Sequence, residues 1–155
     1  HGGARGYLNV FANGSVSAAA AVLWGISGEP MYLALFAGSV ATATADTMAS
    51  EIGVTGGDPY LITTFKKVPA GTNGGITMIG ELTALGGAVI ISLFCFLLGI
   101  IDMPMAIVGI AAGMVGTNID SLVGALIENR GIIGNAGTNI LATAGGGLFA
   151  LLFYL

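Results

Sequence analysis

Charged residues are scarce in this sequence of 155 residues. Lysine, arginine, aspartate and glutamate together make up 8% of the chain, whereas a soluble domain carries about 25%. Apolar residues make up 55%, and this balance predicts an integral membrane protein in a lipid bilayer. The formal net charge of −4 is the opposite of the basic surface that nucleic acids require, so no nucleic-acid partner is expected.

Cysteine and histidine are almost absent as well. Cys95 is the one cysteine, so it forms no internal disulfide, and the one histidine is the first residue. These counts exclude a disulfide-stabilised fold, a zinc site of cysteine and histidine ligands, and catalysis by an internal histidine. Acid–base or metal chemistry in this chain is therefore expected to use carboxylates.

Five apolar runs are each long enough to cross the roughly 30 Å hydrocarbon core of a bilayer as a helix. They cover residues 7–26, 31–50, 76–101, 105–129 and 138–155. The sequence thus predicts an all-α, polytopic transmembrane helical bundle with about five transmembrane helices, forming a single domain over residues 1–155. The 27 glycines suit close helix packing, and one packing face is expected at Ala34, Gly38, Ala41 and Ala45.

The positive charges fall on one side of this predicted topology. They are Arg5, Lys66, Lys67 and Arg130. The connections on the other side carry Glu29 and Asp102 and no base. Because positive residues favour the cytoplasmic side, residues 51–75 are predicted to form a cytoplasmic substrate-binding loop in a multi-pass protein whose active site faces the cytoplasm.

Carboxylates within membrane segments are energetically costly and by default indicate a functional site. The candidate metal ligands are Asp46, Glu51, Glu81 and Asp120. Asp46 and Glu51 are about 140° apart on an ideal helix, so they can share one ion only if the helix breaks between them. Alternative interpretations stay open: solvated carboxylates at Asp46 and Glu51, and a structural partner of the lysines at Glu81.

Asp120 lies in the run GTNIDSLVG, well inside the fourth predicted helix. Thr117, Asn118 and Ser121 are its polar neighbours, and Glu128 shares its helix face at i+8. A carboxylate about two turns deep with such neighbours is expected to face a polar cavity. A hydrogen-bonded structural cluster is the alternative.

The turn before the third predicted helix resembles a phosphate-binding loop. It consists of Gly71, Thr72, Asn73, Gly74 and Gly75. Glycines let backbone N–H groups converge on an anion, and the helix N-terminus adds positive potential. Lys66 and Lys67 would supply charge for phosphate oxygens, or would only orient the chain in the membrane.

Further nucleotide- or phosphate-binding candidates lie on other segments. They are Arg5, Asn9 and Asn13 on the first predicted helix, Ser121 on the fourth, and Asn135 and Asn139 at the start of the fifth. The first three form an i, i+4, i+8 stripe that would line a cavity or make interhelical hydrogen bonds. The last two could contact nucleotide or phosphate, or only cap the helix.

The chemistry that suits these residues is Mg²⁺-dependent phosphoryl or nucleotidyl transfer. The candidate catalytic residues are Asp46, Glu51, Lys66, Lys67 and Asp120. Carboxylates would hold Mg²⁺, and the lysines with the backbone N–H groups of the turn would neutralise the phosphates.

Several ordered motifs resemble one integral membrane family, which includes the plant phytyl-phosphate kinase of tocopherol synthesis. They are RGYLNVFANG, ADTMASEIG, ITTFKKVPAGTNGGITMIGE, GTNIDSLVGALIENR and GNAGTN. A weaker likeness is to CDP-diacylglycerol synthases and dolichol kinase. Members of the family usually carry further N-terminal helices, so this chain is expected to lack an N-terminal part. Whether a homodimer or that segment completes the fold is open.

The resemblance implies a CTP-dependent kinase that converts an isoprenoid monophosphate of the phytyl or geranylgeranyl type to its diphosphate, with Mg²⁺ as cofactor. It implies metal or nucleotide ligands at Asp46, Glu51 and Asp120. It also implies phosphate-binding or site-lining roles at Lys66, Lys67, residues 71–75, Asn135 and Asn139. Two alternatives remain: a CTP-dependent nucleotidyltransferase acting on a lipid phosphate, and a membrane transporter or channel that uses Asp120 and Asn13.

Overall fold

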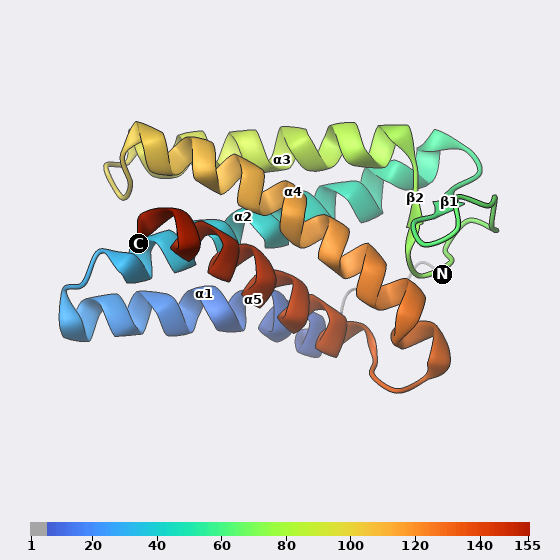
Figure 1. Ribbon diagram of the computed structural model, residues 1–155, viewed down its shortest axis with the longest axis horizontal. Helices are drawn as coiled ribbons and strands as arrows, with labels where there is room; N and C mark the ends of the chain where they lie inside the picture. The colour runs from blue at the N-terminus through green and yellow to red at the C-terminus, as the bar shows by residue number, and fades with distance from the viewer. Residues whose placement is uncertain (1–5) are drawn as a thin grey trace.

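Five long helices form the computed structural model, which describes residues 6–155 (Figure 1). They are α1 (Tyr7–Ser27), α2 (Met31–Ile52), α3 (Met78–Leu97), α4 (Met103–Leu126) and α5 (Asn135–Tyr154). Two short 3₁₀ helices follow α2 and α4, namely η1 (Gly53–Gly56) and η2 (Glu128–Arg130). The predicted all-α helical bundle is confirmed.

A small hairpin inside the predicted 51–75 loop was not expected from the sequence. Strands β1 (Tyr60–Leu61) and β2 (Gly75–Ile76) pair antiparallel. Ile76 therefore belongs to the hairpin, and α3 begins two residues later than predicted. The Thr77 hydroxyl caps this helix by accepting the Gly80 N–H at 2.9 Å. Glu81 consequently lies in the first turn of α3.

Four helical segments of the described chain are long and apolar enough to cross a membrane. They are α1, α3, the stretch Met103–Arg130 that contains α4, and α5. α2 is not among them because threonines, serines and two carboxylates lower its hydropathy. It has less need of an apolar surface, since it packs against all four other helices.

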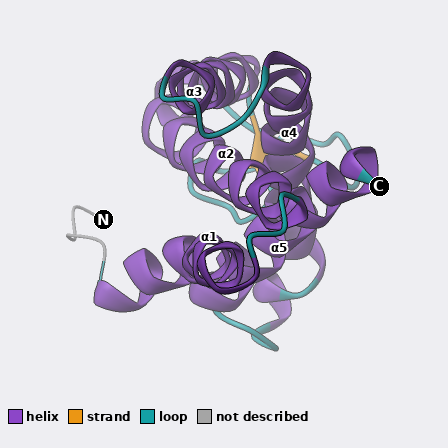
Figure 2. Ribbon diagram, turned by 90° about the vertical axis from the view of Figure 1, so that its left-hand side faces the viewer, coloured by secondary structure: helices purple, strands orange, loops and turns teal. Residues whose placement is uncertain are grey.

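α2 forms the centre of the bundle. The end-on view shows it between α3 and α4 on one side and α1 and α5 on the other (Figure 2). Its predicted packing face is confirmed, because Ala34, Gly38, Ala41 and Ala45 are all buried. At Gly38 the backbone of α5 comes so close that an added Cβ would lie 2.5 Å from the carbonyl oxygen of Gly146.

Small side chains fill the interior, and large apolar side chains lie outside. The largest fully buried side chains are those of Thr42, Thr138, Thr143, Ser39 and Ser92. Leucine, isoleucine and phenylalanine dominate the exposed surface, as at Ile90, Phe94 and Leu152. This distribution suits a bundle in lipid, where close backbone packing holds helices together and the outer face meets acyl chains.

The two ends of the bundle differ. One end carries the α1–α2 and α3–α4 turns, with Glu29 and Asp102. The other end carries the β1–β2 hairpin, η1 and the α4–α5 connection (Figure 1). Lys66, Lys67 and Arg130 all lie in segments at this second end, as the sequence predicted for one side of the membrane.

Candidate active site

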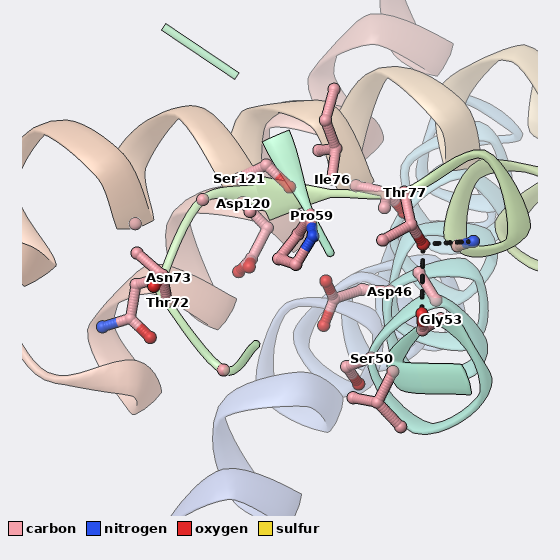
Figure 3. Close-up of a pocket in the computed structure, with 18 of the residues that line it drawn as sticks. Asp46, Ser50, Gly53, Pro59, Thr72, Asn73, Ile76, Thr77, Asp120 and Ser121 are labelled. Atoms are coloured by element: carbon pink, nitrogen blue, oxygen red, sulfur yellow. Dashed lines mark hydrogen bonds between the residues drawn. The ribbon is translucent and has the colours of Figure 1, made fainter. Parts of the chain in front are cut away.

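A polar cavity of about 330 Å³ opens at the hairpin end of the bundle. It is lined where α2 and α4 end and where α3 and α5 begin, and the loop between η1 and α3 closes one side (Figure 3). Polar residues predicted from all of these segments therefore meet in one place, although they are up to 93 residues apart in the chain, from Asp46 to Asn139.

Asp46 of α2 and Asp120 of α4 point into this cavity toward one another (Figure 3). Asp120 is close enough to Asp46 and Glu128 for their charges to interact. Its Oδ1 atom is buried and has no hydrogen-bond partner within residues 6–155. The two carboxylates thus form an acidic pair with an unused acceptor atom.

Two further carboxylates line the cavity, and both accept a hydrogen bond. The Asn118 amide donates to Glu81 Oε2 at 3.3 Å, and the Thr138 hydroxyl donates to Glu128 Oε2 at 2.9 Å. No lysine, arginine or histidine of the described chain is among the lining residues. The cavity therefore contains no basic side chain of the described residues that could offset its carboxylates.

The 71–75 turn contributes all five of its residues to the cavity wall. Two of its N–H groups are used within the turn, because Thr72 donates to Pro69 and Gly75 donates to Thr72. The N–H groups of Gly71, Asn73 and Gly74 donate to no other backbone group in the part of the chain described. An anion could therefore be bound by three N–H groups rather than by the whole run that the sequence predicted.

The 71–75 turn is fixed to the last turns of α4. The Asn129 side chain donates to the Asn73 carbonyl at 3.0 Å. Gly74, with a φ of +80°, lies so close to α4 that an added Cβ would meet the Ser121 carbonyl oxygen at 2.5 Å. These two contacts fix the position of the 71–75 turn relative to α4, and therefore relative to Asp120.

The N-terminus of α5 also reaches the cavity, through Asn135 and Asn139. Gly134, at the N-cap position, provides no side-chain hydrogen bond to the helix. A helix start without such a cap leaves N–H groups and positive potential for an anion. Asn139 is buried and lines the cavity.

Other predicted site residues lie elsewhere. Glu51 is exposed near the end of α2, and Asn9 and Asn13 lie on α1 outside the cavity lining. Lys66 and Lys67 are exposed on the hairpin, where Lys67 Nζ lies 3.7 Å from Asp58. Arg5 falls outside the described residues. These positions do not support direct phosphate contacts by the two lysines in this conformation.

Sequence reasoning did not assign Thr117, Gly124 and Glu128 to the site, although all three line the cavity. Their spacing was the available signal. With Asp120 and Ser121 they recur every three or four residues from α4 to the start of η2, a spacing that predicts one shared helix face.

The residues present fit a divalent cation such as Mg²⁺. No cluster of three carboxylate, histidine or cysteine side chains suitable for a metal occurs within residues 6–155. Mg²⁺ in phosphate-transfer sites, however, is usually held by one or two carboxylates together with substrate phosphates. Asp46 and Asp120 supply that number, and the unpartnered Oδ1 of Asp120 is a suitable ligand atom.

Comparison with known proteins identifies relatives over most of the chain. An uncharacterized membrane protein of Methanocaldococcus jannaschii is 42% identical over 97% of this chain and 63% of its own length. A membrane protein of Synechocystis, also uncharacterized, is 33% identical over 83% of this chain and 51% of its own length. The chloroplastic protein VTE6 of Arabidopsis thaliana is 38% identical over 61% of this chain and 29% of its own length. The chain thus spans less than two thirds of each of these relatives.

No solved structure matches this chain. The family model for the integral membrane protein DUF92 matches residues 1–147, which include every segment that lines the cavity. The recognition from sequence motifs is confirmed at the level of the family, and so is an integral, multi-pass membrane location. The chain belongs to the DUF92 family of integral membrane proteins.

Proposed function

We propose that this chain is the site-bearing part of a CTP-dependent kinase that converts an isoprenoid monophosphate to its diphosphate. The observation that carries the proposal is the single cavity that joins two carboxylates, a glycine-rich turn and an uncapped helix start. These are the groups that bind a metal–polyphosphate complex. The motif resemblance to the family that includes plant phytyl-phosphate kinase supplies the nucleotide and the acceptor.

In this proposal the carboxylates of the cavity would bind the metal ion, and its N–H groups would bind phosphate oxygens. Asp46 and Asp120 would hold Mg²⁺, which would bridge phosphate oxygens and offset their charge. The N–H groups of Gly71, Asn73 and Gly74 and the start of α5 would bind the remaining phosphate oxygens. The fixed contact between the 71–75 turn and α4 would keep donor and acceptor aligned.

The reaction would need no strong base from the protein. An oxygen of the isoprenoid monophosphate would attack the terminal phosphorus of CTP, forming one P–O bond while the bond to the bridging oxygen breaks and CDP leaves. A phosphate monoester is largely ionised at neutral pH, since its second pKa is about 6. The near absence of histidine in the sequence is therefore compatible with this chemistry.

The cavity end of the bundle would face the cytoplasm. Lys66, Lys67 and Arg130 lie in segments at this end, whereas the turns at the opposite end carry Glu29 and Asp102. This asymmetry follows the positive-inside rule. Soluble CTP would then enter from water, while the isoprenoid tail stays in the bilayer.

The test is an assay in detergent micelles with CTP, Mg²⁺ and phytyl or geranylgeranyl monophosphate, read by mass spectrometry. Both this chain and a longer form should be assayed, because the relatives are longer. Asp120→Asn would be the site variant, and Asp102→Asn at the opposite end the matched control, since asparagine caps a helix as well as aspartate does.

Isoprenoid diphosphate plus CDP, lost in Asp120→Asn and kept in Asp102→Asn, is the expected result. A CDP-lipid plus pyrophosphate would instead make the protein a nucleotidyltransferase that uses the same cavity. No product from either form, with the fold intact, would overturn the proposal, and flux in liposomes without nucleotide would then test a transporter.

A further inference from the structure

Two residues that line the same cavity, and are close together in the chain, each carry a buried side-chain oxygen with no hydrogen-bond partner within residues 6–155. Four buried side-chain atoms lack a hydrogen-bond partner within residues 6–155: Ser39 Oγ, Ser92 Oγ, Thr117 Oγ1 and Asp120 Oδ1. Thr117 and Asp120 are three residues apart on α4, about one helical turn, and both line the polar cavity. The two serines are not among the residues that line it. The coincidence of two unused oxygens at one polar surface indicates a ligand.

Thr117 differs from the other threonines inside helices. Four of those donate their hydroxyl hydrogen to the carbonyl four residues earlier, at 2.8–2.9 Å: Thr42, Thr44, Thr83 and Thr143. This is the usual way in which a helix satisfies a threonine. Thr117 makes no such bond in the described chain, although it is only 2% exposed. Its hydroxyl is therefore available to a group in the cavity.

The charge of the cavity selects the kind of ligand. The lining residues Asp46, Glu81, Asp120 and Glu128 are carboxylates, and no base from residues 6–155 lies among them. The unpartnered atoms are both oxygens, one from a carboxylate and one from a hydroxyl. Hard divalent cations such as Mg²⁺ and Mn²⁺ prefer oxygen ligands and would offset the repulsion between Asp46 and Asp120.

We propose that the cavity binds a divalent cation before any nucleotide arrives, through the carboxylates of Asp46 and Asp120 and the hydroxyl of Thr117. The inference rests on the proposed function, because the role given to this bound cation is to coordinate the substrate phosphates. Thr117 becomes a metal ligand that the motifs did not indicate. The protein thus presents a preformed cation site rather than acquiring the metal only as a metal–nucleotide complex.

Electron paramagnetic resonance of Mn²⁺, added to the full chain in detergent without nucleotide, tests the proposal. We expect saturable Mn²⁺ binding that Mg²⁺ displaces, and an unfolding temperature that rises with Mg²⁺ concentration. Thr117→Val should weaken Mn²⁺ binding by about tenfold or more. Thr117→Ser, which keeps the hydroxyl, should restore most of the affinity.

Ser92→Ala is the matched control. Ser92 is also buried and unpartnered, but its hydroxyl lies against Gly109, where an added Cβ would be 2.8 Å away. Its loss should leave Mn²⁺ affinity unchanged. Thr117→Val is expected to fold, because the buried hydroxyl it removes has no hydrogen-bond partner among the described residues that would be left unsatisfied.

Absence of Mn²⁺ binding without nucleotide would overturn the inference, and so would equal affinity in Thr117→Val and the wild-type protein. The Mn²⁺-binding experiment and the kinase assay can fail independently of each other. Mn²⁺ binding without kinase turnover would refute only the proposed function. Kinase turnover without nucleotide-free Mn²⁺ binding would refute only the preformed site.

Discussion

Gly74 offers the sharpest test of how the 71–75 turn is fixed to α4. Its φ is +80°, and an added Cβ would lie 2.5 Å from the Ser121 carbonyl oxygen and 2.8 Å from the Ala125 nitrogen. Both are backbone atoms of a helix, so neither can rotate away. Gly74→Ala should therefore force the turn off α4, or force the helix to move.

Gly71 is the matched control, because its φ is +84° but an added Cβ would have no heavy atom within 4 Å. Gly71→Ala should cost about 1–2 kcal/mol of unfolding free energy, from backbone strain alone. Gly74→Ala should have the same strain plus about 1–3 kcal/mol of overpacking, for a total of about 2–5 kcal/mol. The difference between the two variants isolates the contact with α4.

Two measurements check this difference. Unfolding in detergent gives the loss of stability for each variant, and hydrogen exchange reports the opening of the turn. Backbone amides of residues 71–77 should exchange faster in Gly74→Ala than in Gly71→Ala, because the displaced turn is exposed to water. Equal stability loss and equal exchange in the two variants would refute the close packing of the turn on α4.

Four further substitutions test the cavity and the segments around it. Asp46→Asn and Asp120→Asn should each lower the proposed kinase turnover by about 100-fold or more without unfolding the protein, because each removes a proposed metal ligand; near-normal turnover in both purified variants would contradict the site. Lys67→Ala should change the free energy of unfolding by less than about 1 kcal/mol, since its ion pair with Asp58 is solvent-exposed, with 64% of the lysine side chain accessible. Loss of turnover in Lys67→Ala would show that the hairpin closes over the phosphates. Thr138→Val should destabilise the protein by about 1–3 kcal/mol in thermal unfolding, because it deprives the half-buried Glu128 of the hydrogen bond from the fully buried Thr138 hydroxyl; unchanged stability would show that water replaces the hydroxyl.

The fold followed from the sequence because its main determinant is local. Each apolar run needs about 20 residues to cross a bilayer, and the runs can be counted directly. The residues at which helices start are harder to predict from the sequence, because they depend on capping groups and on pairing with distant segments. Ile76 looks like the first residue of an apolar helix, but its pairing with Tyr60 makes it part of a strand.

The structure brings some of the candidate site residues to the cavity and leaves others outside it, and the reason differs between helix and hairpin. Asp46, Asp120 and Asn139 occupy helix positions whose direction follows from 3.6 residues per turn, and all three line the cavity. Lys66 and Lys67 lie on the hairpin, whose path depends on pairing between Tyr60 and Ile76. Proximity in sequence to the 71–75 turn suggested a shared site, whereas the hairpin places both lysines outside it.

The sequence by itself determined a membrane-embedded helical bundle, its family and the acidic and glycine-rich segments that meet at one end. Composition and local periodicity suffice for these properties. Only the tertiary structure decided which of the carboxylates face one another and that the Thr117 hydroxyl has no hydrogen-bond partner within residues 6–155. It also decided that the 71–75 turn packs on α4. These features depend on how α2, α4 and α5 cross, which is set by contacts between small residues far apart in the chain.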